Sequence, residues 1–417
     1  MAKKESSYTK KPFNISMLAD SMAKAGLKME LLSETGFGDV TEWIDMGCYV
    51  LNAQISGTIF GGVANNRITE FAGDPGSGKT FICLNLARRA QEMGYDVIYI
   101  DTEGALEKKQ LQNFQINPEK FIIQDELDTV ASVSNYMVNL IEGVEKLIDQ
   151  GYAPKIMVFI DSIGMLSTEK EQEDTQKGHD ASDMGLQAKQ LKKLFRLITR
   201  RLSNCNIPLV FTNHVYSGGM YEAKKKASGG QGHIFAASSI LFFSKSHLKD
   251  KADKTEKIGI VGHSTPHKTR FAIPTEVDFH IRFYEGMNPY EGLENFVSWD
   301  ACGIGKGKLY TQKMFEKEKS KPANAQHYQH VDEKTGEISD LVFVPSETGR
   351  WCIKHLGKSV PSIDYLFTSE IFTKDVLVQL DEKVIKPTFE YPDQEKLKRM
   401  KDDMVTLQDI ESNEDAE

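Results

Sequence analysis

Short hydrophobic runs rich in β-branched and aromatic residues recur along the chain, at intervals long enough to hold a helix. Within each run the hydrophobic residues are largely continuous, which is typical of strands that are buried on both faces. We therefore expect these runs to form the strands of a central sheet. The runs are RITEFAG (67–73), DVIYIDTE (96–103), KIMVFIDS (155–162), IPLVFTNH (207–214) and SSILFFSK (238–245).

Segments between these runs have the periodicity of amphipathic helices. Residues 80–93 follow the first run and stop at Gly94, a residue that commonly ends helices. A longer helix is predicted from Met184 onward, because its apolar residues recur at steps of three and four. Strands that alternate with helices predict an α/β fold, in which a mostly parallel central sheet is flanked by helices. The apolar positions of the longer helix are Ala188, Leu191, Phe195, Ile198 and Leu202.

The chain of 417 residues is too long for one ordinary hydrophobic core, so further parts are expected beside the α/β core. A short helix is predicted at 16–28. Beyond Tyr290 the regular pattern is lost, and the polar stretch 315–337 is expected to be a loop. From Asp403 to Glu417 six residues are acidic and none is basic, which favours a solvated tail. The predicted parts are an N-terminal oligomerisation arm (1–45), the core (46–290), a small C-terminal domain (291–400) and the acidic tail (401–417).

Composition narrows the class of protein. Hydrophobic residues make up 40% of the chain and charged residues 27%, as in globular proteins that dissolve in water. No apolar run approaches the roughly 20 residues of a membrane span, and residues 1–11 lack an apolar signal core, so a cytoplasmic protein without a membrane partner is expected. The five cysteines are scattered without a CxxC pair, which argues against disulfides and zinc. A net charge of -9 at first sight argues against a nucleic-acid partner, because proteins that bind nucleic acid usually carry a basic surface, but the charge is unevenly distributed.

The candidate chemistry begins at the end of the first hydrophobic run. Residues 73–80, GDPGSGKT, match the phosphate-binding pattern GxxxxGK[S/T] and lie between a predicted strand and a predicted helix, as that pattern requires. Its glycines let backbone N–H groups turn toward phosphate oxygens at the helix N-terminus. Lys79 is expected to reach the β- and γ-phosphates of ATP, and Thr80 to bind Mg²⁺. The expected nucleotide-binding residues of this loop are Gly73, Asp74, Pro75, Gly76, Ser77, Gly78, Lys79 and Thr80.

Carboxylates at the ends of two other runs complete the predicted ATPase chemistry. Asp161 ends the apolar part of KIMVFIDS, where a carboxylate is placed to hold magnesium together with Thr80. DVIYIDTE ends on Asp101 and Glu103, and a carboxylate there is placed to polarise the water that attacks the γ-phosphate. The spacing alone does not separate these two residues.

The motifs GDPGSGKT, YIDTEGAL, FIDSIGMLS, FTNHVYSGG and SGGQGHIFAASS, in this order, resemble the RecA family, and most closely the UvsX-type recombinases of tailed bacteriophages. The resemblance covers about 52–292 and implies a RecA-like P-loop NTPase core. It assigns the catalytic carboxylate to Glu103 and contact with the γ-phosphate to His214, where bacterial RecA has glutamine. The stretch HKTRFAIPTEVDF is similar to the RecA segment that offers two cations to ATP on the neighbouring subunit, and those residues are Lys268 and Arg270 here.

Two polar segments after the predicted catalytic strands, at about 168–183 and 216–232, are expected to be mobile loops. The family resemblance places both against DNA. The second segment is rich in glycine and carries lysines that are suited to neutralise DNA phosphates, although a solvated lysine run is the alternative. The basic face of the helix after Met184 is expected to be solvated for the most part. The expected DNA-binding residues are Lys224, Lys225, Lys226, Gly229 and Gly230.

These features predict a DNA-dependent and Mg²⁺-dependent ATPase of the recombinase class. We expect it to form helical filaments on single-stranded DNA, to pair them with homologous duplex and to exchange strands in recombination, repair and recombination-dependent replication. Copies of the chain are expected to dock through 13–28, with Phe13 and Ile15 as anchors. Other expected partners are double-stranded DNA, single-strand-binding proteins and mediator proteins. A phage-encoded protein of this kind acts in the host cytoplasm.

Two alternatives stay open. A hexameric DNA helicase shares the same core, but it is expected to need a larger N-terminal domain than 1–45. A scaffold protein that binds ATP without fast turnover is disfavoured by the presence of both Glu103 and Asp161.

Overall fold

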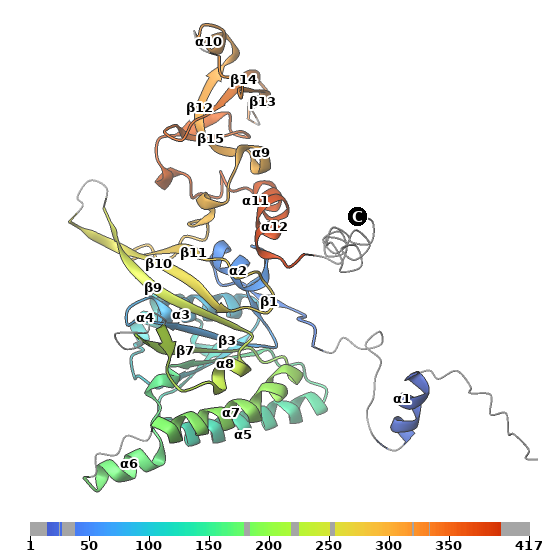
Figure 1. Cartoon of the computed structure of the whole chain (residues 1–417), viewed down its shortest axis with the longest axis vertical. Helices are drawn as coiled ribbons and strands as arrows, with labels where there is room; N and C mark the ends of the chain where they lie inside the picture. Colours follow the sequence, from blue (N-terminus) through green and yellow to red (C-terminus); the bar gives the residue numbers. More distant parts are fainter. Residues whose placement is uncertain are drawn as a thin grey trace, which may run out of the picture. The chain divides into compact units, whose positions relative to one another are not determined.

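The computed structural model describes residues 15–24, 26, 38–178, 184–217, 225–250, 255–318, 321–332 and 334–392 (Figure 1). The chain divides into two compact units, Met1–Thr41 and Glu42–Glu417. In the first unit, α1 (Ile15–Lys24) confirms the short helix that the sequence predicts. The Ile15 side chain is exposed, as are Met17 and Leu18, whereas Phe13 lies outside the described residues.

One large sheet forms the centre of the second unit (Figure 1). Its strand order is β11 (Val277–Arg282), β10 (Lys257–Lys268), β9 (Ser239–Lys249), β3 (Ile68–Gly73), β7 (Leu209–Ser217), β6 (Ile156–Asp161), β4 (Asp96–Asp101) and β5 (Phe121–Gln124), and β8 (Lys225–Ala227) pairs with β7. From β9 to β5 neighbouring strands are parallel, whereas β10 pairs antiparallel with both β9 and β11. The predicted mostly parallel α/β sheet is confirmed.

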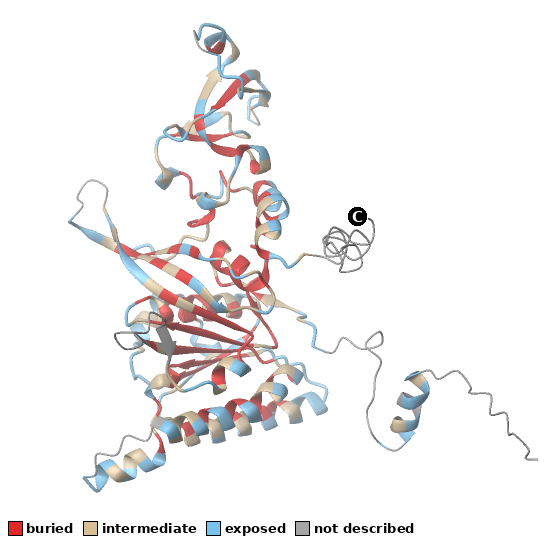
Figure 2. Cartoon of the chain, viewed as in Figure 1, coloured by how far each residue is buried: buried red, intermediate tan, exposed pale blue. Residues whose placement is uncertain are grey.

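Helices cover both faces of this sheet. On one face α2 (Tyr49–Ser56) and α3 (Lys79–Glu92) share a hydrophobic core with strand residues such as Phe71, and on the other face α5 (Val130–Asp149) and α7 (Met184–Asn204) share a second core with residues such as Phe211. The central strands β3, β7, β6 and β4 are largely buried between the two cores (Figure 2), whereas Ile122 and Ile123 of the edge strand β5 are exposed. Successive side chains of a central strand point to opposite faces and so enter both cores. Shorter helices of this region are α4 (Lys108–Asn113), α6 (Glu169–Gln176) and α8 (Gly232–Ala236).

The two longer helices that the sequence predicts are both present. α3 begins one residue before the predicted 80–93, and α7 begins at Met184. Of the predicted stripe, Leu191, Phe195, Ile198 and Leu202 are buried and Ala188 is half-buried. Leu197, which lies outside the stripe, is exposed.

Two segments that were expected to be loops contain regular structure. The segment 168–183 includes α6, whose start is closed by reciprocal hydrogen bonds: Glu171 N donates to Thr168 Oγ1 at 3.1 Å, and Thr168 N donates to Glu171 Oε2 at 2.7 Å. The polar composition of this segment favours a loop, but the spacing of Thr168 and Glu171 forms a capping box that begins a helix. The segment 315–337 includes β13 (Gln326–Val331), a polar strand with no continuous apolar run to reveal it.

The C-terminal part of the second unit holds an antiparallel sheet of strand order β13, β14 (Ile338–Pro345), β12 (Ile304–Thr311), β15 (Arg350–Ile353) and β16 (Lys358–Val360). The chain then returns to the α/β core, where the buried Asp381 carboxylate accepts hydrogen bonds from Thr58 Oγ1 (2.7 Å) and Ile59 N (2.9 Å). The division at residue 290 stays a prediction. The remaining elements are β1 (Trp43–Ile44), β2 (Val63–Ala64), α9 (Trp299–Cys302), α10 (Gln312–Glu316), α11 (Lys374–Leu380) and α12 (Lys386–Phe389).

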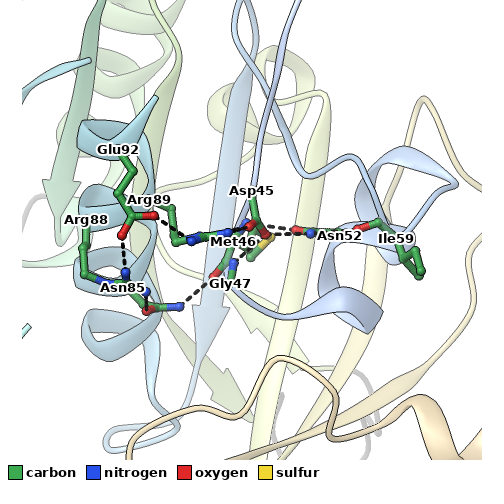
Figure 3. Close-up of polar contacts among 9 residues, drawn as sticks. All are labelled: Asp45, Met46, Gly47, Asn52, Ile59, Asn85, Arg88, Arg89 and Glu92. Atoms are coloured by element: carbon green, nitrogen blue, oxygen red, sulfur yellow. Dashed lines mark hydrogen bonds and ion pairs between the residues drawn. The ribbon is translucent and has the colours of Figure 1, made fainter. Parts of the chain in front are cut away.

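A polar network connects α3 to the segment that precedes β2, and we call its members Asp45, Asn52, Asn85 and Arg89 the α3 anchor (Figure 3). Arg89 pairs with Asp45, and Asn85 Nδ2 donates to the Met46 carbonyl at 2.7 Å. Asn52 Nδ2 donates to Asp45 Oδ1 at 2.8 Å and lies 3.1 Å from the Ile59 carbonyl oxygen, while Asn52 Oδ1 accepts from Met46 N at 2.9 Å. The helix that follows the phosphate-binding loop is therefore tied to the segment 45–59.

Within the described parts of the chain, every helix is too short or too polar to cross a membrane.

Candidate nucleotide and DNA site

The predicted phosphate-binding loop joins the carboxyl end of β3 to α3. Gly76 and Gly78 have φ angles of 70° and 92°, in the left-handed region that favours glycine. A Cβ atom at Gly73 would lie 2.4 Å from the Phe243 carbonyl oxygen, so this position has no room for a side chain. The loop turns directly into the N-terminus of a 14-residue helix, where backbone N–H groups favour phosphate.

Lys79 lies inside this loop. Its Nζ donates to the carbonyl oxygens of Gly73 (2.9 Å) and Asp74 (3.2 Å). Burial lowers the pKa of Lys79, and the nearby carboxylates act in the opposite direction. Ser77 Oγ is buried and has no hydrogen-bond partner among the described residues. A cation resting on loop carbonyls beside an unpartnered hydroxyl fits a site that takes phosphate oxygens.

Asp161, at the end of β6, lies at the centre of the site. Its Oδ2 accepts hydrogen bonds from Thr80 Oγ1 (2.8 Å) and the Tyr99 hydroxyl (2.7 Å), and its Oδ1 accepts from Thr212. The structure therefore brings together Thr80 and Asp161, the two expected magnesium ligands. Hydroxyl and carboxylate oxygens are ligands that Mg²⁺ prefers, so these residues fit the ion.

Asp101 and Glu103 have different surroundings, which the sequence did not reveal. Asp101 is buried, and its carboxylate accepts hydrogen bonds from the backbone N–H groups of Glu103 (3.2 Å) and Leu106 (3.0 Å). The Glu103 side chain is 32% exposed. Its Oε1 accepts from Ser162 Oγ at 2.8 Å and lies 3.2 Å from His214 Nε2. Asp101 shapes the turn, whereas Glu103 faces the site.

Strand register explains why these distant residues meet. Gly73 of β3 is paired with His214 of β7, and Asp101 of β4 is paired with Asp161 of β6. All four residues therefore lie at the carboxyl edge of the parallel strands, where ligands of open α/β sheets bind. Ser162 is a further site residue that sequence reasoning missed, although it directly follows the predicted Asp161.

A pocket of about 780 Å³ lies against α3, the helix that follows the phosphate-binding loop, and sequence reasoning missed it. Phe81, the residue after Thr80, lines this pocket together with Phe114, Phe283 and Tyr284. The rings of Phe81 and Phe114 meet edge to face, with 4.8 Å between their centroids. Aromatic walls beside a phosphate loop suit a flat nucleobase. No motif marks the pocket, because its walls come from three separate segments.

The segment 216–232, called loop 2 below, begins two residues after His214. Its base is closed by β8 on β7 and by the hydrogen bond from Ser228 N to the His214 carbonyl oxygen at 3.0 Å. Of its lysines, Lys224 lies outside the described residues, and only the backbone of Lys225 and Lys226, in β8, is described.

Gly229 and Gly230, at the end of loop 2, pack against α7. They have φ angles of 86° and 77°. Added Cβ atoms would lie 2.8 Å from Leu191 and 2.9 Å from Ala188, respectively. The close approach to α7 is therefore one reason for glycine at these positions, besides the predicted contact with DNA.

Lys268 and Arg270 lie near the end of β10, and Arg270 is exposed. Lys268 Nζ donates to the carbonyl oxygen of Ile234 at 2.7 Å and lies 3.4 Å from that of Phe235, both in α8 of the same subunit. Burial lowers the pKa of Lys268, and the neighbouring Arg270 lowers it further.

This sheet has a phosphate loop after β3 and carboxylates at the ends of the parallel strands β6 and β4, which is the arrangement of a RecA-like P-loop NTPase. Residues 24–288 match the family model of the RecA N-terminal domain, and the chain belongs to this family. The resemblance to RecA proteins is thus confirmed.

Individual relatives are similar at moderate identity. The chain is 28% identical to the recombination and repair protein of Enterobacteria phage T4 over 250 residues, which cover 58% of this chain and 60% of that protein. It is 28% identical to protein RecA of Colwellia psychrerythraea over 275 residues, covering 61% of this chain and 74% of that one. For protein RecA of Clostridium botulinum (strain Eklund 17B / Type B) the identity is 30% over 251 residues, covering 59% and 65%.

Proposed function

We propose that the chain is a DNA-dependent ATPase that works as a recombinase, forming filaments on single-stranded DNA and exchanging strands with homologous duplex. One observation carries this proposal. Glu103 is within 3.2 Å of His214, and His214 lies at the base of loop 2, next to Ser228. A carboxylate suited to activate water therefore lies directly beside the segment that is suited to hold DNA. The relative from phage T4, named a recombination and repair protein, supports the same role.

Each site residue has a task in this proposal. The backbone of Gly73 to Gly78 and the Lys79 ammonium bind the phosphates, while Thr80 and Asp161 hold Mg²⁺. The metal supplies charge stabilisation at the phosphates. Glu103 orients the attacking water and accepts its proton, and His214 links the γ-phosphate position to loop 2. The aromatic pocket at Phe81 holds the base.

Hydrolysis depends on assembly in this proposal. Lys268 and Arg270 act on ATP held by the neighbouring subunit, where cations stabilise charge that develops during phosphoryl transfer. The exposed apolar residues of α1, Ile15, Met17 and Leu18, are suited to dock on another copy of the chain. Lysines 224 to 226 contact the phosphates of single-stranded DNA.

The test is ATP turnover measured with and without saturating single-stranded oligonucleotide. The control variant is Lys79→Ala, which removes the ammonium group that is proposed to bind the phosphates. We expect strong stimulation by the oligonucleotide, and turnover near zero for the variant at either condition. Equal turnover with and without the oligonucleotide would contradict the proposal. Electron microscopy of the same samples separates a recombinase from a hexameric helicase, because the first forms open filaments and the second closed rings.

A further inference from the structure

Three buried polar side chains lie together beneath loop 2, and we call Glu70, Asn213 and His233 the buried cluster. Glu70, on β3, has its Oε1 2.9 Å from Asn213 Nδ2 and its Oε2 2.8 Å from His233 Nδ1. All three side chains are fully buried. A carboxylate is stable in such a place only when its oxygens are paired, so this is a specific arrangement.

The buried cluster joins the P-loop strand to both ends of loop 2. Glu70 lies on the same strand as Gly73, three residues before it. Asn213 accepts a hydrogen bond from His214 N at 2.9 Å and donates to the Ser228 carbonyl oxygen at 3.0 Å. His233 belongs to α8, which follows Gly229 and Gly230. A shift of either end of loop 2 therefore acts on Glu70.

Helix α8 extends this connection to Lys268. One end of the helix is held by His233 on Glu70, and its Ile234 and Phe235 carbonyl oxygens face Lys268 Nζ. The same short helix therefore contacts the P-loop strand and the lysine that acts on the next subunit.

The buried cluster has one incomplete contact. His233 Nε2 is buried and has no hydrogen-bond partner among the described residues. A Cβ atom built on Gly229 would lie 3.9 Å from that nitrogen, so the nitrogen faces the glycine segment of loop 2. A buried polar atom without a partner costs free energy, and an arrangement of that segment that supplies one is favoured by comparison.

We infer that the buried cluster is a positioning device that couples DNA on loop 2 to ATP hydrolysis. When DNA binds, the glycine segment at 229–230 moves to form a hydrogen bond with His233 Nε2. Helix α8 then shifts together with His233. This shift releases Lys268 from the Ile234 carbonyl oxygen, so that Lys268 acts on ATP in the adjacent subunit. None of the three residues touches a substrate, so their effect is on coupling and not on the chemical step itself. This inference rests on the proposed function.

Glu70→Gln tests the inference with almost no change in volume. A neutral imidazole has one donor and one acceptor nitrogen. Opposite the Glu70 carboxylate, Nδ1 donates and Nε2 is left as an acceptor. A glutamine that pairs with Asn213 through its oxygen presents its NH₂ group to Nδ1, which makes Nε2 the donor. The variant therefore reverses the polarity of the nitrogen that faces Gly229.

The measurement is the ratio of ATP turnover at saturating single-stranded oligonucleotide to turnover without it. For Glu70→Gln we expect this ratio to fall by about fivefold or more, the usual size of a coupling between sites, with basal turnover and the KM for ATP unchanged. The matched control is Asp381→Asn, which neutralises another buried carboxylate on a segment that contacts Thr58 and Ile59. The control should keep the wild-type ratio.

A second variant guards against loss of folding. The double variant Glu70→Met with His233→Phe replaces both partners of the Glu70–His233 bond by apolar groups, which is less disruptive than removing one of them. Asn213 loses its bond to Glu70 but keeps its bond to Ser228. We expect the same loss of stimulation. If the wild-type protein is stimulated by DNA and either folded variant is stimulated equally, the inference is wrong and the proposed function stands. If the wild-type protein itself is not stimulated, the proposed function fails first.

Discussion

The α3 anchor and the buried cluster are two polar networks that flank the phosphate-binding loop, and they differ in one respect. In the α3 anchor the amide of Asn52 has a partner at both ends, with Met46 N on its oxygen and the Asp45 carboxylate and Ile59 carbonyl near its nitrogen (Figure 3). In the buried cluster, His233 Nε2 has no partner among the described residues.

This difference suits the α3 anchor to hold its helix in place and the buried cluster to rearrange. When all buried polar groups of a network are paired, any rearrangement breaks hydrogen bonds and raises the free energy of the protein. Such a network therefore holds α3 in place. When one buried group is unpaired, a rearrangement that gives this group a hydrogen-bond partner lowers the free energy of the protein. The comparison therefore predicts that damage to the α3 anchor lowers stability, whereas damage to the buried cluster lowers coupling.

The largest effect is expected when the chemistry between the two networks is removed. Glu103→Gln leaves both networks intact but removes the base, so we expect turnover to fall by about 10²–10⁴-fold with nucleotide binding kept. Single-turnover hydrolysis and nucleotide titration measure the two properties. Normal hydrolysis by this variant would show that the catalytic carboxylate is another residue.

The next effect tests the α3 anchor directly. Asn52→Ala leaves Met46 N and the Ile59 carbonyl without their side-chain partner in a buried place, which should lower the free energy of unfolding by about 2–4 kcal/mol. Urea denaturation followed by circular dichroism checks this. The stimulation of the folded variant by DNA should equal that of the wild type, and a fall in that ratio would remove the distinction between the two networks.

A smaller effect is expected from the three consecutive lysines of loop 2. Replacing Lys224, Lys225 and Lys226 by alanine removes three phosphate contacts, so the slope of log affinity against log salt should flatten by about 2, from roughly 0.7 per contact. Fluorescence anisotropy with a labelled oligonucleotide gives this slope. Lys193→Ala, an exposed lysine of α7, is the matched control. An unchanged slope in the triple variant would show that these lysines are solvated and do not contact DNA phosphates.

The smallest effect is expected on the outer surface of α7. Arg201 donates to Glu145 of α5 at 2.9 Å and 2.6 Å, and both side chains are partly exposed. Arg201→Gln should therefore cost less than about 1 kcal/mol of stability and leave DNA affinity unchanged. Thermal unfolding and the same anisotropy titration measure both. A marked loss of DNA affinity would place DNA on this face of the protein.

The strands and the phosphate-binding loop were predictable because their signals are local. A continuous apolar run such as that before Asp161 and a motif such as GDPGSGKT report the conformation of neighbouring residues. Polar composition predicts a loop at 168–183, but Thr168 and Glu171 form a capping box there that begins α6. This local signal for a helix was missed. β13 was missed for another reason, because its residues have no apolar pattern to detect.

The sequence by itself determined that the chain has a mostly parallel α/β core with a phosphate loop on its first long strand, and which family it resembles. The resemblance already assigns the catalytic role to Glu103. Only the tertiary structure decided that Asp101 is bonded to backbone N–H groups, that Phe81 lines an aromatic pocket, and that Glu70 meets His233 across 163 positions of the chain. Backbone propensity and short motifs act between neighbours in sequence, whereas these contacts depend on strand order and register. A one-residue slip in register would turn every such side chain to the opposite face of the sheet.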